Sequence, residues 1–216
     1  MTTLWYPDTS NNNFASTQEC VDFLEQLKPE GFSGIVQKAS EGNYYQDPFW
    51  PVVQQWCQEN DFPNIPYHYL TEDNPSSQAA TFVSNGGGPY VMFDVEANSG
   101  DLINFWAVVN AFNAAGVNVT MAYLPQWYWS EIGSPDLSLL APNGIALVSS
   151  AYPAGSGFAS NIYAEACGDN GEGWDPYGGA TPAAWQFTDE ANIDGFIVDC
   201  NAFKGTDLNQ LFTGAA

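Results

Sequence analysis

The sequence predicts one α/β domain over residues 1–216, folded as an irregular TIM-like (β/α) barrel with eight strands and fewer than eight helices. Strand-like and helix-like segments alternate along the first half of the chain, which favours a parallel sheet. Eight strand-like segments without a nucleotide-binding glycine motif favour a closed barrel over an open sheet. The 216 residues are 45% hydrophobic, enough for one barrel core, and neither a repeat nor a linker divides them.

Eight short apolar segments, bounded by turn residues, are predicted as strands. They cover residues 4–8, 33–38, 65–70, 90–96, 117–123, 145–149, 184–188 and 195–199. The fourth contains Val91-Met92-Phe93 and should be buried on both faces, as strands of parallel sheets are.

Helices are predicted where a capping signal precedes an amphipathic stretch. Ser16-Thr-Gln-Glu19 is a capping box for a helix reaching about Lys28. Asp47-Pro48 begins a second helix, with apolar residues at the i, i+3, i+4 and i+7 positions. Further helices are predicted from residue 74, over about 100–115 and over 206–213. After the fifth strand, loops rich in Gly, Ser and Pro replace most of the helices.

The charge of the chain excludes several kinds of partner. There are 25 acidic residues, three lysines and no arginine, giving a formal net charge of -22. Nucleic acid is excluded because binding requires cationic side chains that replace phosphate counterions. An anionic membrane would repel the chain, and no apolar stretch is long enough for membrane insertion. A neutral ligand held by hydrogen bonds and aromatic faces fits this composition. Solubility or adaptation to salt is the alternative explanation of the charge.

No cofactor is predicted, and a zinc site is disfavoured because His68 is the only histidine and the cysteines lack paired spacing. Cys20 and Cys57 fall in predicted helices and should be buried. A Cys167–Cys200 disulfide is possible if the protein functions outside the cell. Residues 1–8 lack the basic start and apolar run of a secretory signal.

Carboxylates follow the predicted strands where a parallel barrel gathers its active groups. Asp8 ends the first strand, Asp94 and Glu96 end the fourth, and Asp199 ends the last, with Asn201 two residues on. Residues i and i+2 of a strand face the same way, so Asp94 and Glu96 should point together at the barrel mouth. The first and last strands are neighbours in a closed barrel, so Asp8 and Asp199 should also be close.

Carboxylates this close cannot all ionise easily, so the pKa of at least one should rise. A protonated carboxyl group beside an ionised one is the pair that glycosidic cleavage requires. Four carboxylates and an asparagine also suit magnesium or calcium. The spacing of these residues alone leaves both kinds of site open.

Seven segments of the sequence resemble the motifs of one enzyme family and occur in the same order. They are Tyr6–Ser10 (YPDTS), Ile35–Gly42 (IVQKASEG), Pro66–Leu70 (PYHYL), Val91–Glu96 (VMFDVE), Met121–Tyr123 with Gln126–Trp129 (MAY, QWYW), Ala184–Thr188 (AWQFT) and Val198–Asn201 (VDCN). Together they resemble glycoside hydrolase family 25, the Chalaropsis-type lysozymes. Cys200 stands where the family usually has an aliphatic residue.

The resemblance implies a peptidoglycan muramidase that cuts the β-1,4 bond between N-acetylmuramic acid and N-acetylglucosamine and so lyses bacterial walls. It implies that Glu96 is the general acid and that Asp94 stabilises the charged intermediate. Asp8 and Asp199 would complete the acidic pocket. The resemblance therefore favours glycosidic cleavage by carboxyl groups over a metal site.

Smaller expectations concern the residues around the acids. Tyr67, Tyr123, Trp127 and Trp185 are candidate sugar-binding residues, as is Asn201, with core packing as the alternative for the aromatic ones. His68 alternates with Tyr67 and should be structural, facing the helix layer. Lys38 should form an ion pair with Glu41 or with a strand-end acid.

Two other functions remain as alternatives: a non-catalytic glycan-binding barrel, and a metal-dependent hydrolase of another polymer. The expected partner is bacterial peptidoglycan, and the chain is expected to be a monomer. The expected setting is a phage lysis enzyme that waits in the host cytoplasm before its release to the cell wall, or otherwise an extracellular enzyme.

Overall fold

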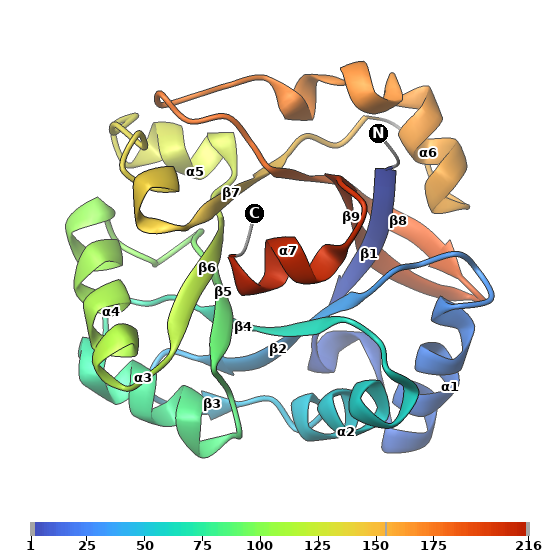
Figure 1. Ribbon diagram of the computed structural model, residues 1–216, viewed down its shortest axis with the longest axis horizontal. Coiled ribbons are helices and arrows are strands. Elements are labelled where there is room, and N and C mark those ends of the chain that lie inside the picture. Colours follow the sequence, from blue (N-terminus) through green and yellow to red (C-terminus); the bar gives the residue numbers. More distant parts are fainter. Residues whose placement is uncertain (1–2, 154, 215–216) are drawn as a thin grey trace.

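The computed structural model describes residues 3–153 and 155–214, which form a closed barrel (Figure 1). Its strands, in order around the barrel, are β1 (Thr3–Thr9), β9 (Phe196–Lys204), β8 (Ala184–Ile193), β7 (Ala146–Ser150), β6 (Asn118–Tyr123), β5 (Tyr90–Asp94), β4 (Asn64–Tyr69) and β2 (Ile35–Glu41). Pairing of β1 with β2 closes the ring. The short strand β3 (Tyr45–Gln46) pairs antiparallel with the end of β2. The eight-stranded barrel predicted from the sequence is confirmed.

The last strand corrects the expectation of a parallel sheet. β9 runs antiparallel to both of its neighbours, β1 and β8. Asp194 and Gly195 link β8 to β9 with positive φ angles of 48° and 94°, and Ile193 pairs with Phe196. An Asp-Gly pair with two positive φ angles is a favoured two-residue hairpin turn. The chain therefore returns directly, and no crossover helix separates its last two strands.

Seven α-helices lie among the described residues. They are α1 (Thr17–Leu27), α2 (Trp50–Asn60), α3 (Pro75–Ser84), α4 (Leu102–Ala114), α5 (Gln126–Glu131), α6 (Ala159–Glu165) and α7 (Leu208–Thr213). The predicted cap of α1 is present, since the Ser16 side chain accepts a hydrogen bond from the Glu19 amide. Helices α5 and α6 were not predicted from the sequence; both are short and have no side-chain cap.

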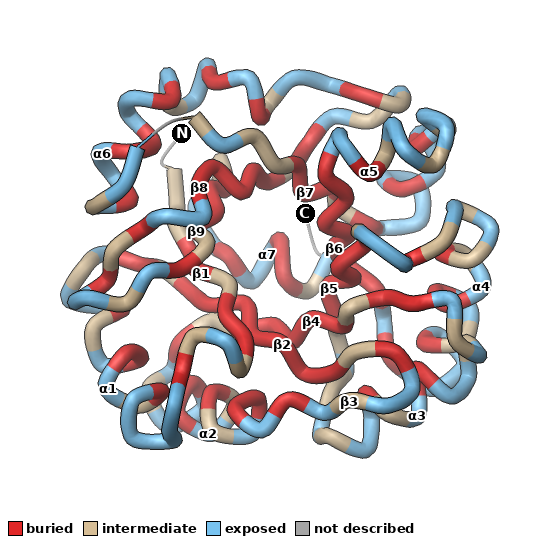
Figure 2. Tube along the Cα trace, turned by 180° about the vertical axis from the view of Figure 1, so that it is seen from behind, coloured by how far each residue is buried: buried red, intermediate tan, exposed pale blue. Residues whose placement is uncertain are grey.

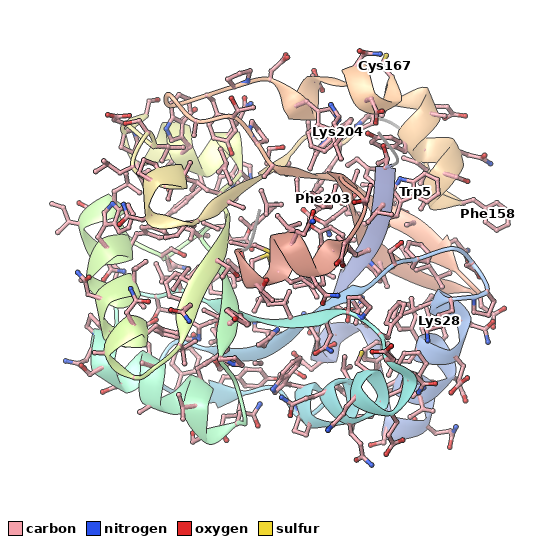
Figure 3. The ribbon with its side chains drawn as sticks, in the orientation of Figure 1. Trp5, Lys28, Phe158, Cys167, Phe203 and Lys204 are labelled. Carbon is pink, nitrogen blue, oxygen red and sulfur yellow. The ribbon has the colours of Figure 1, made fainter. Side chains whose placement is uncertain are left out.

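The interior of the barrel is closed at its N-terminal end by α7. Leu208, Leu211 and Phe212 of this helix pack against the side chains that fill the barrel. The Phe212 ring meets Tyr6 of β1 edge-on, with 5.4 Å between the ring centroids. Figure 1 shows α7 lying across the centre of the ring, and Figure 3 shows Phe203 of β9 beside it. Polar groups of the interior therefore gather at the opposite end.

The other helices cover the outside of the barrel over two further clusters of buried apolar residues. Figure 2 shows the strands as a largely buried ring, with most of the exposed segments at its periphery and some on α7. The buried side chain of His68 lies in this outer layer, as predicted. Its ring nitrogens are 2.8 Å from Ser40 Oγ and 3.0 Å from Gln78 Oε1.

All four cysteines are free thiols. Cys20 and Cys57 are buried in α1 and α2, as expected. Cys167 is exposed at the edge of the molecule near α6 (Figure 3), whereas Cys200 is buried in β9. These two residues form no disulfide. Within the described ranges, no helix is long and apolar enough to cross a membrane.

Candidate active site

Strands β1 and β9 bring two predicted acids together. Their register pairs Asp8 with Asp199, and Tyr6 with Asn201. The sequence placed Asp199 at the end of the last strand. In the structure it is instead the fourth residue of β9. Because β9 is antiparallel, its beginning lies beside the carboxyl end of β1. The two carboxyl groups are therefore cross-strand neighbours at the barrel mouth.

The other two predicted acids come from β5 and the loop after it. Asp94 is the last residue of β5 and is only 9% exposed. Glu96 lies two residues beyond the strand. Its backbone N–H donates to Ser99 Oγ at 3.0 Å, and that hydroxyl donates to Leu70 O at 2.8 Å. Ser99 is fully buried, so this turn holds the backbone of Glu96 against the end of β4.

The four carboxyl groups influence one another electrostatically. Burial raises the pKa of Asp94 well above its usual range, and the charges of Glu96 and Asp8 raise it further. Burial followed by Asp8 raises the pKa of Glu96. Burial followed by Asp8 also raises the pKa of Asp199, to about 8. The structure thus brings the four predicted acids into one cluster, which loses its protons in coupled steps.

Lys38 supplies a positive charge beside this cluster. Its Nζ forms an ion pair with Glu41, as predicted, and lies 5.0 Å from the centre of the Tyr69 ring. The charge of Lys38 lowers the pKa values of both Asp94 and Glu96, against the larger effects that raise them. Lys38 therefore limits how strongly the cluster holds its protons.

A chain of hydrogen bonds leads to Asp8 from the neighbouring strands. Asn201 Nδ2 and Gln186 Nε2 donate to Asp8 Oδ2 at 2.7 and 2.8 Å. Gln186 Oε1 accepts a hydrogen bond from the Tyr152 hydroxyl, which lies 3.3 Å from the Tyr123 hydroxyl. Neither Gln186 nor Tyr152 was predicted from the sequence as a site residue. The alternation of β8 could have placed Gln186 inside the barrel, but Tyr152 lies in a loop whose path no pattern predicts.

Comparison with known proteins identifies the family. The family model described as Glycosyl hydrolases family 25 matches residues 13–196, most of the chain. This chain belongs to glycosyl hydrolase family 25. It is therefore a glycoside hydrolase, as predicted. No curated protein sequence matches it.

Solved structures share the fold of this family 25 chain at low sequence identity. The bacterial lysozyme from Streptomyces coelicolor is 19% identical with a TM-score of 0.72, over 100% of this chain and 98% of that one. The family GH25 lysozyme from Aspergillus fumigatus is 21% identical with a TM-score of 0.67, over 100% of both chains. The catalytic domain of endolysin ply40, from bacteriophage P40 of Listeria monocytogenes, is 18% identical with a TM-score of 0.67, over 97% of both chains.

The predicted sugar-binding aromatic residues of the family 25 chain lie in different places. Tyr67 and Tyr123 belong to the cluster of side chains inside the barrel, and Tyr123 pairs in register with Asp94. Trp127 is the second residue of α5 and is 51% exposed. Trp185 is fully buried on the outer side of β8, against Tyr163 and Trp174. The structure does not bring Trp185 to the acids, because Gln186 occupies the inward-facing position of that strand.

One carboxylate oxygen of the site is both buried and without a hydrogen-bond partner among the described residues. It is Oδ1 of Asp94. A buried carboxylate oxygen without a donor disfavours the ionised form, which agrees with the raised pKa of Asp94. Over residues 3–153 and 155–214, no group of three or more His, Cys, Asp or Glu residues is arranged to hold a metal ion.

Proposed function

We propose that this family 25 glycoside hydrolase is an N-acetylmuramidase. It hydrolyses the β-1,4 bond between N-acetylmuramic acid and N-acetylglucosamine in bacterial peptidoglycan, and thereby lyses the wall. The observation that carries the proposal is the pairing of Glu96, a half-buried acid with a raised pKa, with the buried Asp94. The names of the similar structures, which are lysozymes and an endolysin, support the choice of substrate.

Glu96 is the general acid of the proposed reaction. Cleavage requires a proton on the leaving oxygen, so Glu96 must be protonated when the substrate is bound. Its burial and the nearby charge of Asp8 disfavour the ionised form. Because Glu96 is less buried than Asp94, it is also the carboxyl group closer to a sugar chain that enters the mouth from outside.

Asp94 stabilises the positive charge that develops on the sugar. This residue is 9% exposed, and its carboxylate would accept the N–H of the substrate's acetamido group. A donor to this carboxylate favours the ionised form of Asp94, and this leaves the proton of the coupled pair on Glu96. An acetamido group oriented in this way has its carbonyl oxygen free to face the anomeric carbon. Substrate binding thus assigns the two carboxyl groups their different roles.

Product analysis tests the proposal. Purified peptidoglycan is digested with the wild-type protein, with and without a chelator, and the new reducing ends are reduced with borohydride and identified. A muramidase creates reduced muramic acid and is unaffected by the chelator. New glucosamine ends would refute the choice of bond, and loss of activity with chelator would favour the metal-dependent hydrolase. Binding without cleavage would favour the glycan-binding barrel.

A further inference from the structure

The hydrogen-bond donors around the Asp8–Asp199 pair are unequally divided. Asp8 Oδ2 accepts two N–H groups, from Asn201 at 2.7 Å and from Gln186 at 2.8 Å. Asp199 Oδ2 has only a longer contact of 3.5 Å with the same Gln186 amide nitrogen. N–H groups that donate to a carboxyl group favour its ionised form. The geometry therefore favours a negative charge on Asp8 over one on Asp199.

The orientation of the Gln186 amide decides this difference, and Tyr152 fixes that orientation. The Tyr152 hydroxyl donates its single proton to Gln186 Oε1, so the amide NH2 must face Asp8. Having used that proton, Tyr152 can only accept from Tyr123. Donation thus runs in one direction, from Tyr123 through Tyr152 and Gln186 to Asp8. Without the Tyr152 proton, the amide could turn and present its oxygen to Asp8.

We propose that Tyr152 and Gln186 are positioning residues that make Asp8 the ionised member, and Asp199 the proton-bearing member, of the cross-strand pair. As a contribution to catalysis, this role rests on the proposed function. An ionised Asp8 is the charge that raises the pKa of Glu96. Tyr152 and Gln186 therefore help Glu96 to keep its proton, although neither contacts Glu96.

Other titratable groups face this pair and act on it or respond to it. They are Asp94 of β5, Glu96, Asp189 of β8, Tyr6 of β1, Tyr67 of β4, Tyr152 and Cys200 of β9. Lys38 of β2 acts on the neighbouring Asp94 and Glu96. Gln186 and Asn201 are the neutral groups that donate to Asp8, and they distinguish it from Asp199. A test must therefore read the two carboxyl groups separately.

Carbon-13 NMR titration of the Asp8 and Asp199 carboxyl groups tests the proposal in the full-length protein without substrate. Asp8→Asn and Asp199→Asn assign the two signals. We expect Asp8 to ionise at lower pH than Asp199 in the wild type. Tyr152→Phe and Gln186→Met should each raise the pH at which Asp8 ionises. The double variant should match Gln186→Met, because Tyr152 acts only through Gln186.

Tyr163→Phe is the matched control, since its hydroxyl donates to Asp169 on the outside of the barrel; it should leave both titrations unchanged. Asp199 ionising first in the wild type would overturn the proposal, as would a folded Tyr152→Phe protein with an unaltered Asp8 titration. If Gln186→Met does not fold, Tyr152→Phe carries the test alone, because that side chain is 45% exposed. A wild type that titrates as expected but does not cut peptidoglycan would refute only the proposed function.

Discussion

Two neighbouring charges of opposite sign shift the pKa of Glu96 in opposite directions. Asp8 raises the pKa of the Glu96 carboxyl group and Lys38 lowers it, while burial has the largest effect and raises it. A general acid works only while protonated. Its contribution is therefore present at low pH and is lost as the pH rises through the raised pKa of Glu96. The alkaline limb of the pH–activity profile should lie above the ordinary range of a glutamate, and the optimum should be acidic.

Substitution of the two charges should move this limb in opposite directions. Asp8→Asn removes a negative charge, lowers the pKa of Glu96 and shifts the limb to lower pH. Lys38→Met removes a positive charge and shifts it to higher pH. Lys28→Met is the control, because Lys28 bonds to Asn60 O on the protein's outer surface. The measurement is kcat/KM against pH on soluble wall fragments. Shifts of the same sign in both variants, or a flat wild-type profile, would contradict this account.

Much of the site was predictable at the level of single residues. The i, i+2 spacing placed Asp94 and Glu96 together, and barrel closure placed Asp8 near Asp199. The hydrogen-bond partners of Asp8 were not predicted, because they depend on strand register and on the path of the loop that carries Tyr152. Trp185 was predicted to bind sugar because it lies in a family motif. Sequence alone did not show that Gln186, and not Trp185, faces inward.

The β8–β9 hairpin determines where Asp199 lies. A parallel last strand would carry Asp199 at its end only after a crossover connection. The tight turn at Asp194-Gly195 instead starts β9 at the barrel mouth, and Asp199 follows within four residues. The same turn brings Asn201 opposite Tyr6. The positions of one acid, Asp199, and one amide donor, Asn201, therefore depend on the geometry of this turn.

Gly195→Ala should destabilise this hairpin by about 1 kcal/mol, because its φ of 94° is strained for a residue with a side chain. The cost is conformational, since an added Cβ would meet no atom within 4 Å. Asp194→Asn should be nearly neutral, because asparagine tolerates the left-handed conformation. Urea unfolding measures both. Equal stability of Gly195→Ala and the wild type would contradict the account of the turn.

Elements with strong local signals were predicted well. The capping box at Ser16 and the buried strand through Phe93 indicated α1 and β5. Helices α5 and α6 have one or two turns each and lack side-chain caps, so their sequences carry little helical signal. The Asp-Gly pair was a readable hairpin signal. The strand–helix alternation in the first half of the chain nevertheless favoured a parallel last strand, which the structure shows to be wrong.

At the scale of the whole molecule, the net charge of -22 opposes binding to an anionic wall. Long-range repulsion between exposed charges is screened over about 10 Å at 0.1 M salt. Activity on intact walls should therefore rise from low to moderate ionic strength. Activity on a small soluble wall fragment, which carries only a few charges, should change much less, and this comparison is the control. A steady fall of wall lysis from the lowest salt concentration would contradict the prediction.

The division of roles between Glu96 and Asp94 is the central claim. It is tested most directly by reducing-end release from purified peptidoglycan by the wild type, Glu96→Gln, Asp94→Asn and the surface control Glu131→Gln. We expect Glu96→Gln to lose at least about a hundredfold in rate, the usual contribution of a general acid. Asp94→Asn should also be strongly impaired, and Glu131→Gln should match the wild type. A folded Glu96→Gln protein that retains wild-type activity would contradict the account.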